Sequence, residues 1–158
     1  MRWFFFHPPV RGNDAESLFS IADIDRLADV SVVAVYPALS PQHYKTALAL
    51  VGKGLVIAGV GNGNFPSSIH GYLTQYVDAG GIVVRASQVP MGHVSRNIEV
   101  DDDQLGSVAS LGLTPQKARI LLALLLNKNM TPRQLQNAFS CQIPTATKTC
   151  GEVQRATQ

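Results

Sequence analysis

The sequence Leu55-Val-Ile-Ala-Gly-Val-Gly-Asn-Gly-Asn64 joins a short apolar run to a glycine-rich turn, and this order decides the fold. Four consecutive apolar residues at its start predict a strand that is buried on both faces, as in a parallel sheet. Glycines directly after such a strand predict a tight turn into the next element. That element is a helix from about Pro66 to Ala79, which Gly80 and Gly81 end.

Comparable segments on either side complete a repeating pattern of strands and helices. Val30–Tyr36 is β-branched and apolar and predicts another strand buried on both faces, and Ile82–Ala86 predicts a third strand. Between the first two strands we expect a helix over Ser40–Lys53, with Ser40 as its N-cap and Gly54 as its stop. Strand, helix, strand, helix, strand at this spacing forms two βαβ units. Right-handed crossovers then predict an α/β fold, a small parallel sheet flanked by helices.

The remaining segments predict the edges of this domain. A short helix is expected over Ile21–Leu27, and Val89–Gly112 is predicted to be one long irregular connection. Such connections in compact domains tend to be functional or mobile. Two helices that begin with Thr-Pro follow: Thr114–Asn127, which is rich in Leu and Ala and expected to lie against the sheet, and the amphipathic Thr131–Gln142.

Composition bounds the organisation of the chain. It has 158 residues, 46% of them hydrophobic, which suits one globular domain with its own core. We expect an irregular lead-in over residues 1–20, the domain over 21–142 and a polar, Thr-rich disordered tail over 143–158.

A net charge of +2 without a basic tract argues against a nucleic-acid partner. Ile120–Leu126 is far shorter than the roughly 20 apolar residues that span a bilayer. No signal peptide is predicted at the start.

The glycine-rich turn Gly59–Asn64 is the first candidate site. It follows the carboxyl end of a predicted strand, the edge where open α/β sheets bind ligands. Read from Gly59, the sixth position is Asn64, so the turn lacks the last glycine of a dinucleotide fingerprint. No P-loop lysine follows it either. The local pattern leaves two readings open: a ligand-binding turn, and a tight turn in which Asn adopts a left-handed conformation.

The acidic cluster Glu99–Asp103 is the second candidate. Clustered carboxylates can hold an ammonium group or a hard cation, but the spacing is not that of an EF-hand. The local pattern favours a solvated acidic loop.

Cys141 and Cys150 lie at or beyond the last helix and are expected to be free thiols. We predict no catalytic residue within the chain, no metal site and no cofactor. Four histidines lack metal-ligand spacing: His7, His43, His70 and His93.

Several separate segments, taken in order, resemble one protein family. Together they closely resemble the C-terminal domain of L-asparaginases, particularly the type II and glutaminase-asparaginase group, over about residues 8–142. The resemblance implies a flavodoxin-like parallel sheet, and it identifies residues 1–20 as a remnant of the segment that joins the family's two domains. The segments are Ile57–Asn64, Val83–Pro90, Glu99–Asp102, Val108–Ser110 and Thr114–Ile120.

The resemblance also implies roles for two residues. In the family the N-terminal domain supplies a threonine nucleophile, and the C-terminal domain of the neighbouring subunit adds an asparagine and a glutamate that hold the substrate. By motif position these are Asn64 and Glu99. A carboxylate at Glu99 would pair with the α-ammonium group of asparagine, and Asn64 would orient that group or the threonine–water network. Neither of the family's signatures, Thr-Gly-Gly-Thr and Thr-Gly-Thr-Asp, occurs in this chain.

The implied reaction is hydrolysis of L-asparagine, or of L-glutamine, through an acyl-enzyme. The implied partners are an N-terminal asparaginase domain and sister subunits, and the chain alone is expected to be inactive. Two alternatives stay open: a non-catalytic binding or oligomerisation module, and a degraded gene product. Type II relatives are often periplasmic. That location is a family expectation, and the sequence itself leaves the compartment unknown.

Overall fold

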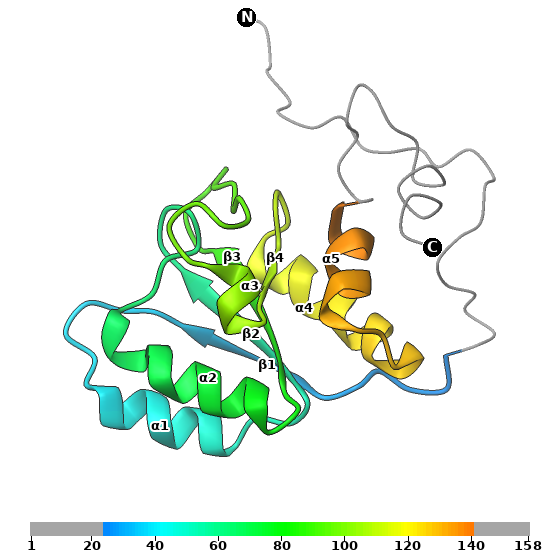
Figure 1. The fold of residues 1–158 in the computed structure, drawn as a ribbon, viewed down its shortest axis with the longest axis horizontal. Helices are drawn as coiled ribbons and strands as arrows, with labels where there is room; N and C mark the ends of the chain where they lie inside the picture. Colours follow the sequence, from blue (N-terminus) through cyan, green and yellow to red (C-terminus); the bar gives the residue numbers. More distant parts are fainter. Residues whose placement is uncertain (1–23, 141–158) are drawn as a thin grey trace, which may run out of the picture.

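A computed structural model describes residues 24–140, which form three layers (Figure 1). The middle layer is a sheet of four parallel strands in the order β1-β2-β3-β4. The expected α/β fold, a small parallel sheet flanked by helices, is confirmed. The strands are β1 (Val30–Ala34), β2 (Gly54–Gly59), β3 (Ile82–Ser87) and β4 (Val108–Ala109).

Helices cover both faces of the sheet (Figure 1). Because the strands follow one another in chain order, the right-handed crossovers place α1, α2 and the short α3 on one face. After β4 the chain crosses to the other face, where α4 and α5 pack. No helix within residues 24–140 has the length and apolarity that a membrane crossing requires. The helices are α1 (Pro41–Ala49), α2 (His70–Asp78), α3 (Asp102–Leu105), α4 (Pro115–Leu125) and α5 (Pro132–Ser140), with 3₁₀ turns η2 (Ser67–Ile69) and η3 (Leu126–Lys128).

The central strand β2 divides the core in two. All of its residues are buried, which confirms the prediction that this strand is covered on both faces. Leu55 and Ile57 point to one side, where they pack with Tyr44 of α1 and Leu73 of α2. Val56 points to the other side, into the cluster formed with α4 and α5. Two apolar layers therefore fix the sheet, and with it the position of the turn that follows β2.

The first strand departs from its prediction. β1 ends at Ala34, and the expectation that it is buried on both faces is wrong, because the Val32 side chain is 39% exposed. Within the described chain β1 is an edge strand that pairs with β2 alone. A continuous β-branched run is typical of any strand in a parallel sheet, so the pattern does not separate an edge strand from a central one.

The first helix is shorter than predicted. The sequence predicted a helix over Ser40–Lys53, but α1 ends at Ala49, and Gly54 is the first residue of β2. A Cβ at Gly54 would lie 2.7 Å from a methyl group of Val30 and 2.8 Å from one of Leu126. Glycine is required at this position by packing against β1 and η3, and it does not end the helix.

The helix predicted over residues 21–27 is absent from its described part, residues 24–27. This segment bonds to α4 and to η3 instead. The backbone N–H of Ala28 donates to the Ala123 carbonyl at 3.3 Å, and Asn127 Nδ2 donates to the Arg26 carbonyl at 2.8 Å. A seven-residue helix is only marginally stable by itself. The hydrogen bonds to the rest of the domain therefore determine the backbone conformation of this segment. The predicted lead-in 1–20, the tail 143–158 and both cysteines lie outside the described residues.

The long connection predicted over residues 89–112 contains α3 and β4, so the expectation of an irregular segment is wrong there. β4 has two residues, too few to leave a periodic pattern in the sequence. A buried glutamine of α5 completes its hydrogen bonding. Gln136 Oε1 accepts from the Ala109 N–H at 2.8 Å, and Gln136 Nε2 donates to the Ala109 carbonyl at 3.2 Å. The side-chain amide thus takes the place of a further strand.

Replacement of Gln136 by Leu should destabilise the domain. Both backbone groups of Ala109 would be left buried and unpaired, and the expected loss in the free energy of unfolding is about 2–4 kcal/mol. Urea unfolding followed by circular dichroism measures it. The matched control is Gln116→Leu on the exposed start of α4, with an expected change within about 0.5 kcal/mol. Equal losses in the two variants would contradict the role assigned to Gln136.

Candidate functional site

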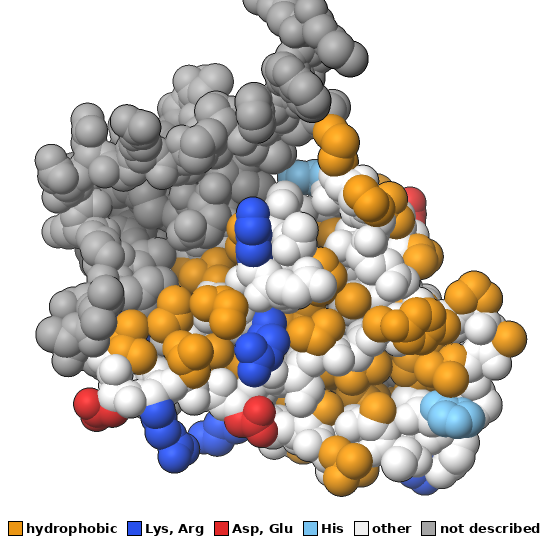
Figure 2. Space-filling view, turned by 180° about the vertical axis from the view of Figure 1, so that it is seen from behind, with side chains coloured by type: hydrophobic (Ala, Val, Ile, Leu, Met, Phe, Trp, Pro, Cys, Tyr) orange, Lys and Arg blue, Asp and Glu red, His pale blue; other side chains and the backbone are white. Residues whose placement is uncertain are grey.

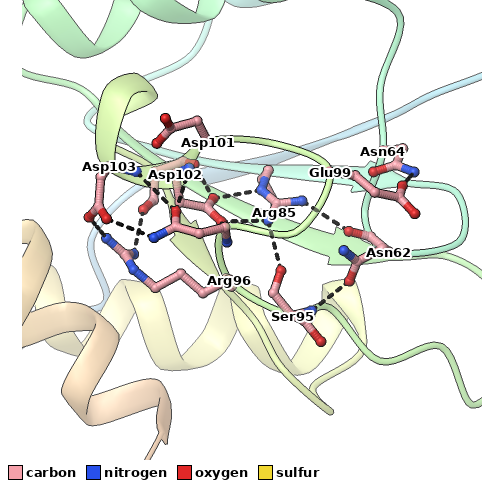
Figure 3. Close-up of polar contacts among 12 residues, drawn as sticks. Asn62, Asn64, Arg85, Ser95, Arg96, Glu99, Asp101, Asp102 and Asp103 are labelled. Atoms are coloured by element: carbon pink, nitrogen blue, oxygen red, sulfur yellow. Dashed lines mark hydrogen bonds and ion pairs between the residues drawn. The ribbon is translucent and has the colours of Figure 1, made fainter.

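Asn64 and Glu99 meet at the carboxyl edge of the sheet. Asn64 closes the turn after β2, and Glu99 lies 35 residues later, in the connection between β3 and α3. Asn64 Nδ2 donates a hydrogen bond to Glu99 Oε2 (Figure 3). Glu99 itself is exposed. The structure therefore brings together the two side chains that the resemblance placed in one site.

The turn before Asn64 has a conformation that requires glycine. Val60 and Asn64 exchange two backbone hydrogen bonds, of 3.0 and 2.8 Å, which close the turn. Gly63 has a φ of +74°, in the left-handed region that favours glycine. A Cβ at Gly59 would lie 2.4 Å from the Asn64 carbonyl oxygen. These glycines let the chain fold back closely enough to place the Asn64 side chain beside Glu99.

A fully buried ion pair lies beneath this site. Arg85 in β3 and Asp102 at the start of α3 both have 0% exposed side chains. Arg85 Nε donates to Asp102 Oδ1 at 2.7 Å, and Arg85 Nη2 donates to Asp102 Oδ2 at 2.6 Å. Two parallel bonds between a guanidinium and a carboxylate fix both distance and orientation. The pair therefore ties α3 to the centre of the sheet.

The same guanidinium reaches the turn and the loop. Arg85 Nη1 donates to the Asn62 carbonyl at 2.9 Å, and Arg85 Nη2 donates to the Ser95 carbonyl at 3.2 Å. Asn62 and Ser95 are also joined directly, because the Ser95 N–H donates to Asn62 Oδ1 at 2.5 Å. We call Arg85, Asp102, Asn62 and Ser95 the polar clamp (Figure 3). It connects the turn that carries Asn64 with the loop that carries Glu99.

Further hydrogen bonds satisfy the Asp102 carboxylate. Oδ1 accepts from the Ser107 hydroxyl, and Oδ2 accepts from the Asn97 N–H at 3.0 Å. Burial alone would raise the pKa of Asp102, but the hydrogen bonds from Arg85, Ser107 and Asn97 and the charge of Arg85 hold this pKa below its ordinary value. Asp102 is therefore ionised at neutral pH.

The acidic cluster divides into different roles, so the predicted solvated acidic loop is wrong for Asp102. The other three carboxylates of the cluster are exposed. Asp101 caps α3 by accepting a hydrogen bond from its backbone. Asp103 accepts from Asn97 and pairs with Arg96, and these hydrogen bonds lower the pKa of Asp103. Local sequence alone did not separate the buried carboxylate from its neighbours, because its partner lies 17 residues away.

The sequence prediction missed Arg85 as a site residue, and it gave Asn62 no role of its own within the candidate turn. Arg85 carries a signal, since a lone charge within a buried apolar strand requires a partner. Two side-chain atoms in the site are buried without a hydrogen-bond partner in the described chain: Asn62 Nδ2 and Asn64 Oδ1. Buried amides with an unpaired atom are rare in native interiors. Within residues 24–140 no three His, Cys, Asp or Glu side chains are grouped as metal ligands.

Asp102→Asn should remove stability at neutral pH and flatten the acid side of the stability curve. The folded pKa of Asp102 is depressed, so its contribution is present above the unfolded pKa of about 3.9 and is lost as the pH falls through the folded value. Loss of one partner of a buried pair costs about 3–5 kcal/mol. Urea unfolding between neutral and acid pH tests this, with Asp103→Asn as the exposed control. A variant as stable as the wild type at pH 7 would contradict the account.

Comparison with known proteins adds to this geometry. The glutaminase/asparaginase C-terminal domain family matches residues 29–139. The chain is 38% identical to L-asparaginase 2 of Escherichia coli over 132 residues, which is 84% of this chain and 38% of that protein. It is 37% identical to a probable periplasmic L-asparaginase of Haemophilus influenzae over 121 residues, 77% of this chain and 35% of that protein.

A third relative is the glutaminase-asparaginase of Pseudomonas aeruginosa, which is 34% identical over 137 residues, 86% of this chain and 38% of that protein. The chain thus spans little more than a third of the length of these relatives. The matched residues, 29–139, contain β1 to β4, all five α-helices but the last residue of α5, and every residue of the site. This chain therefore belongs to the glutaminase/asparaginase C-terminal domain family.

Proposed function

We propose that this chain forms the substrate-holding half of an L-asparaginase active site. The observation that carries the proposal is the direct contact between Asn64 and Glu99 at the carboxyl edge of the sheet. These are the two residues to which the family resemblance gives substrate contacts. In this proposal the threonine nucleophile comes from an N-terminal asparaginase domain, and the site is completed between subunits.

The chemistry of the pair suits the α-ammonium group of an amino acid. An ammonium group is a donor without acceptors, so it needs carboxylate and carbonyl oxygens around it. Asn64 Nδ2 donates its hydrogen bond to Glu99 and thereby orients the carboxylate. Asn64 Oδ1 is buried and has no hydrogen-bond partner in the described chain, so Glu99 is the group of the pair that faces the substrate. Glu99 is exposed, and its charge can make a charge-assisted bond to the substrate.

The proposed reaction hydrolyses the side-chain amide of L-asparagine, or that of L-glutamine. The threonine hydroxyl attacks the amide carbon, ammonia leaves, and water then hydrolyses the ester to release aspartate or glutamate. Glu99 and Asn64 do not form or break these bonds. They fix the substrate so that its amide carbon meets the nucleophile in a reactive geometry.

Exposed apolar side chains support a partner at this edge. Val60 lies in the turn itself, Ile98 precedes Glu99 and is 70% exposed, and Met91 in the loop after β3 is 78% exposed. Apolar side chains also gather on the face that Figure 2 shows, with Lys and Arg side chains among them. Large apolar side chains exposed beside the site agree with an N-terminal domain or sister subunits as partners there.

Ammonia release from L-asparagine tests the proposal. The chain alone should release none, and the chain supplied with the N-terminal domain of the E. coli relative should release ammonia. Robust hydrolysis by the chain alone would overturn it. Co-elution of the two parts in size-exclusion chromatography without any hydrolysis would favour the alternative of a non-catalytic oligomerisation module.

In the completed enzyme, Glu99→Gln should raise the KM for L-asparagine by about ten- to a hundredfold, because a hydrogen bond to a charged group is worth about 1.5–3 kcal/mol. The kcat should change much less, since the amide chemistry lies elsewhere. Steady-state ammonia release measures both constants. Asp78→Asn, at the end of α2 on the opposite edge of the sheet, is the matched control and should leave KM unchanged. An unaltered KM in Glu99→Gln would refute the role of Glu99.

A further inference from the structure

We propose that Arg85 and Asn62 are positioning residues for the substrate-holding pair. They fix the turn that carries Asn64 against the loop that carries Glu99. The inference rests on the proposed function for what the pair holds, whereas the contacts that carry it belong to this chain alone.

The contact between Asn64 and Glu99 needs support from elsewhere. It joins an exposed carboxylate to a turn, and exposed polar contacts contribute little to the order of the groups that make them. The residues around Glu99, from Asn97 to Val100, form neither helix nor strand. A bond between two such segments persists only if stronger interactions already hold them in place.

Arg85 provides such an interaction because its donors are spread over three segments. Two bonds go to Asp102, which follows Glu99, one goes to the Ser95 carbonyl, which precedes it, and one goes to Asn62 in the turn. The loop is thus fixed on both sides of Glu99 by one side chain from the centre of the sheet. The planar guanidinium group can donate to acceptors in all three segments at once, whereas the single ammonium group of a lysine cannot.

Asn62 forms the second link between turn and loop. Its carbonyl accepts from Arg85, and its side-chain oxygen accepts from the Ser95 N–H. It lies two residues before Asn64, between Gly61 and Gly63, which both have positive φ angles. Because glycine backbones have wide freedom, the bonds of Asn62 hold the turn in one conformation.

The other ion pair of this loop provides a contrast. Arg96 and Asp103 are 32% and 69% exposed, and Arg96 also donates to the Ser107 carbonyl and to Gln136 of α5. Among the described residues, this pair makes no hydrogen bond or ion pair with the turn that carries Asn64. It stabilises the loop through Asn97 and against α5, whereas the bonds that join the loop to the turn come from the polar clamp. Asp103→Asn is therefore the matched control for loss of a charge in the same segment.

Nuclear magnetic resonance of the full chain tests the proposal without any activity assay. The side-chain amide resonances of Asn64 should move on Glu99→Gln, because the change removes the charge of their acceptor. We expect the same substitution to move them by less than half as much in an Arg85→Lys background. In the Asp103→Asn background the response should equal that of the wild type.

A full Asn64 response in the Arg85→Lys background would overturn the proposal, since a merely structural arginine lowers stability and leaves this local signal unchanged. If Arg85→Lys does not fold, Asn62→Ala decides, because it keeps the buried ion pair and removes the side-chain link to Ser95. It should also reduce the Asn64 response, and an undiminished response would refute the inference. These outcomes concern the clamp alone, so they remain distinct from a failure to hydrolyse asparagine.

Discussion

The ion pair between Arg85 and Asp102 places two full charges in a region from which water is excluded. Removing both charges from water costs several kcal/mol per ion, and only good geometry and further hydrogen bonds offset that cost. Here the carboxylate accepts from Arg85, Ser107 and Asn97, and the guanidinium donates to two backbone carbonyls besides. The relative position of β3 and α3 is consequently restricted to arrangements that keep all these bonds.

This restriction explains how a site can be built on loops. Glu99 belongs to a connection without regular structure, yet both of its flanks are bonded to a side chain that rises from the sheet. The turn of Asn64 is held on the sheet by β2, whose six residues are buried between two apolar layers. In the proposed function this rigidity is an advantage, because a preorganised surface does not lose conformational freedom when a partner and a substrate bind.

The sequence predicted what depends on local pattern. Local pattern predicted β2, the glycine-rich turn and the helix that follows it. The Thr-Pro pairs predicted where α4 and α5 begin. Gly54 was misread as a helix stop, because its reason is a contact with Val30 and Leu126 that no local pattern contains. Asn64 and Glu99 were predicted from family motifs, and the local pattern did not show that their side chains meet. Arg85 was visible as a charge in an apolar strand, but its partner depends on how the chain returns after 17 residues.

The central claim is that the clamp acts on substrate binding through Glu99, and a double-mutant cycle on KM for L-asparagine in the completed enzyme tests it most directly. Arg85→Lys and Glu99→Gln should each raise KM, and the double variant should raise it little more than Glu99→Gln alone. Residues that act through one another show such non-additivity, whereas independent sites add in free energy. A KM for the double variant equal to the product of the two single effects would contradict the account.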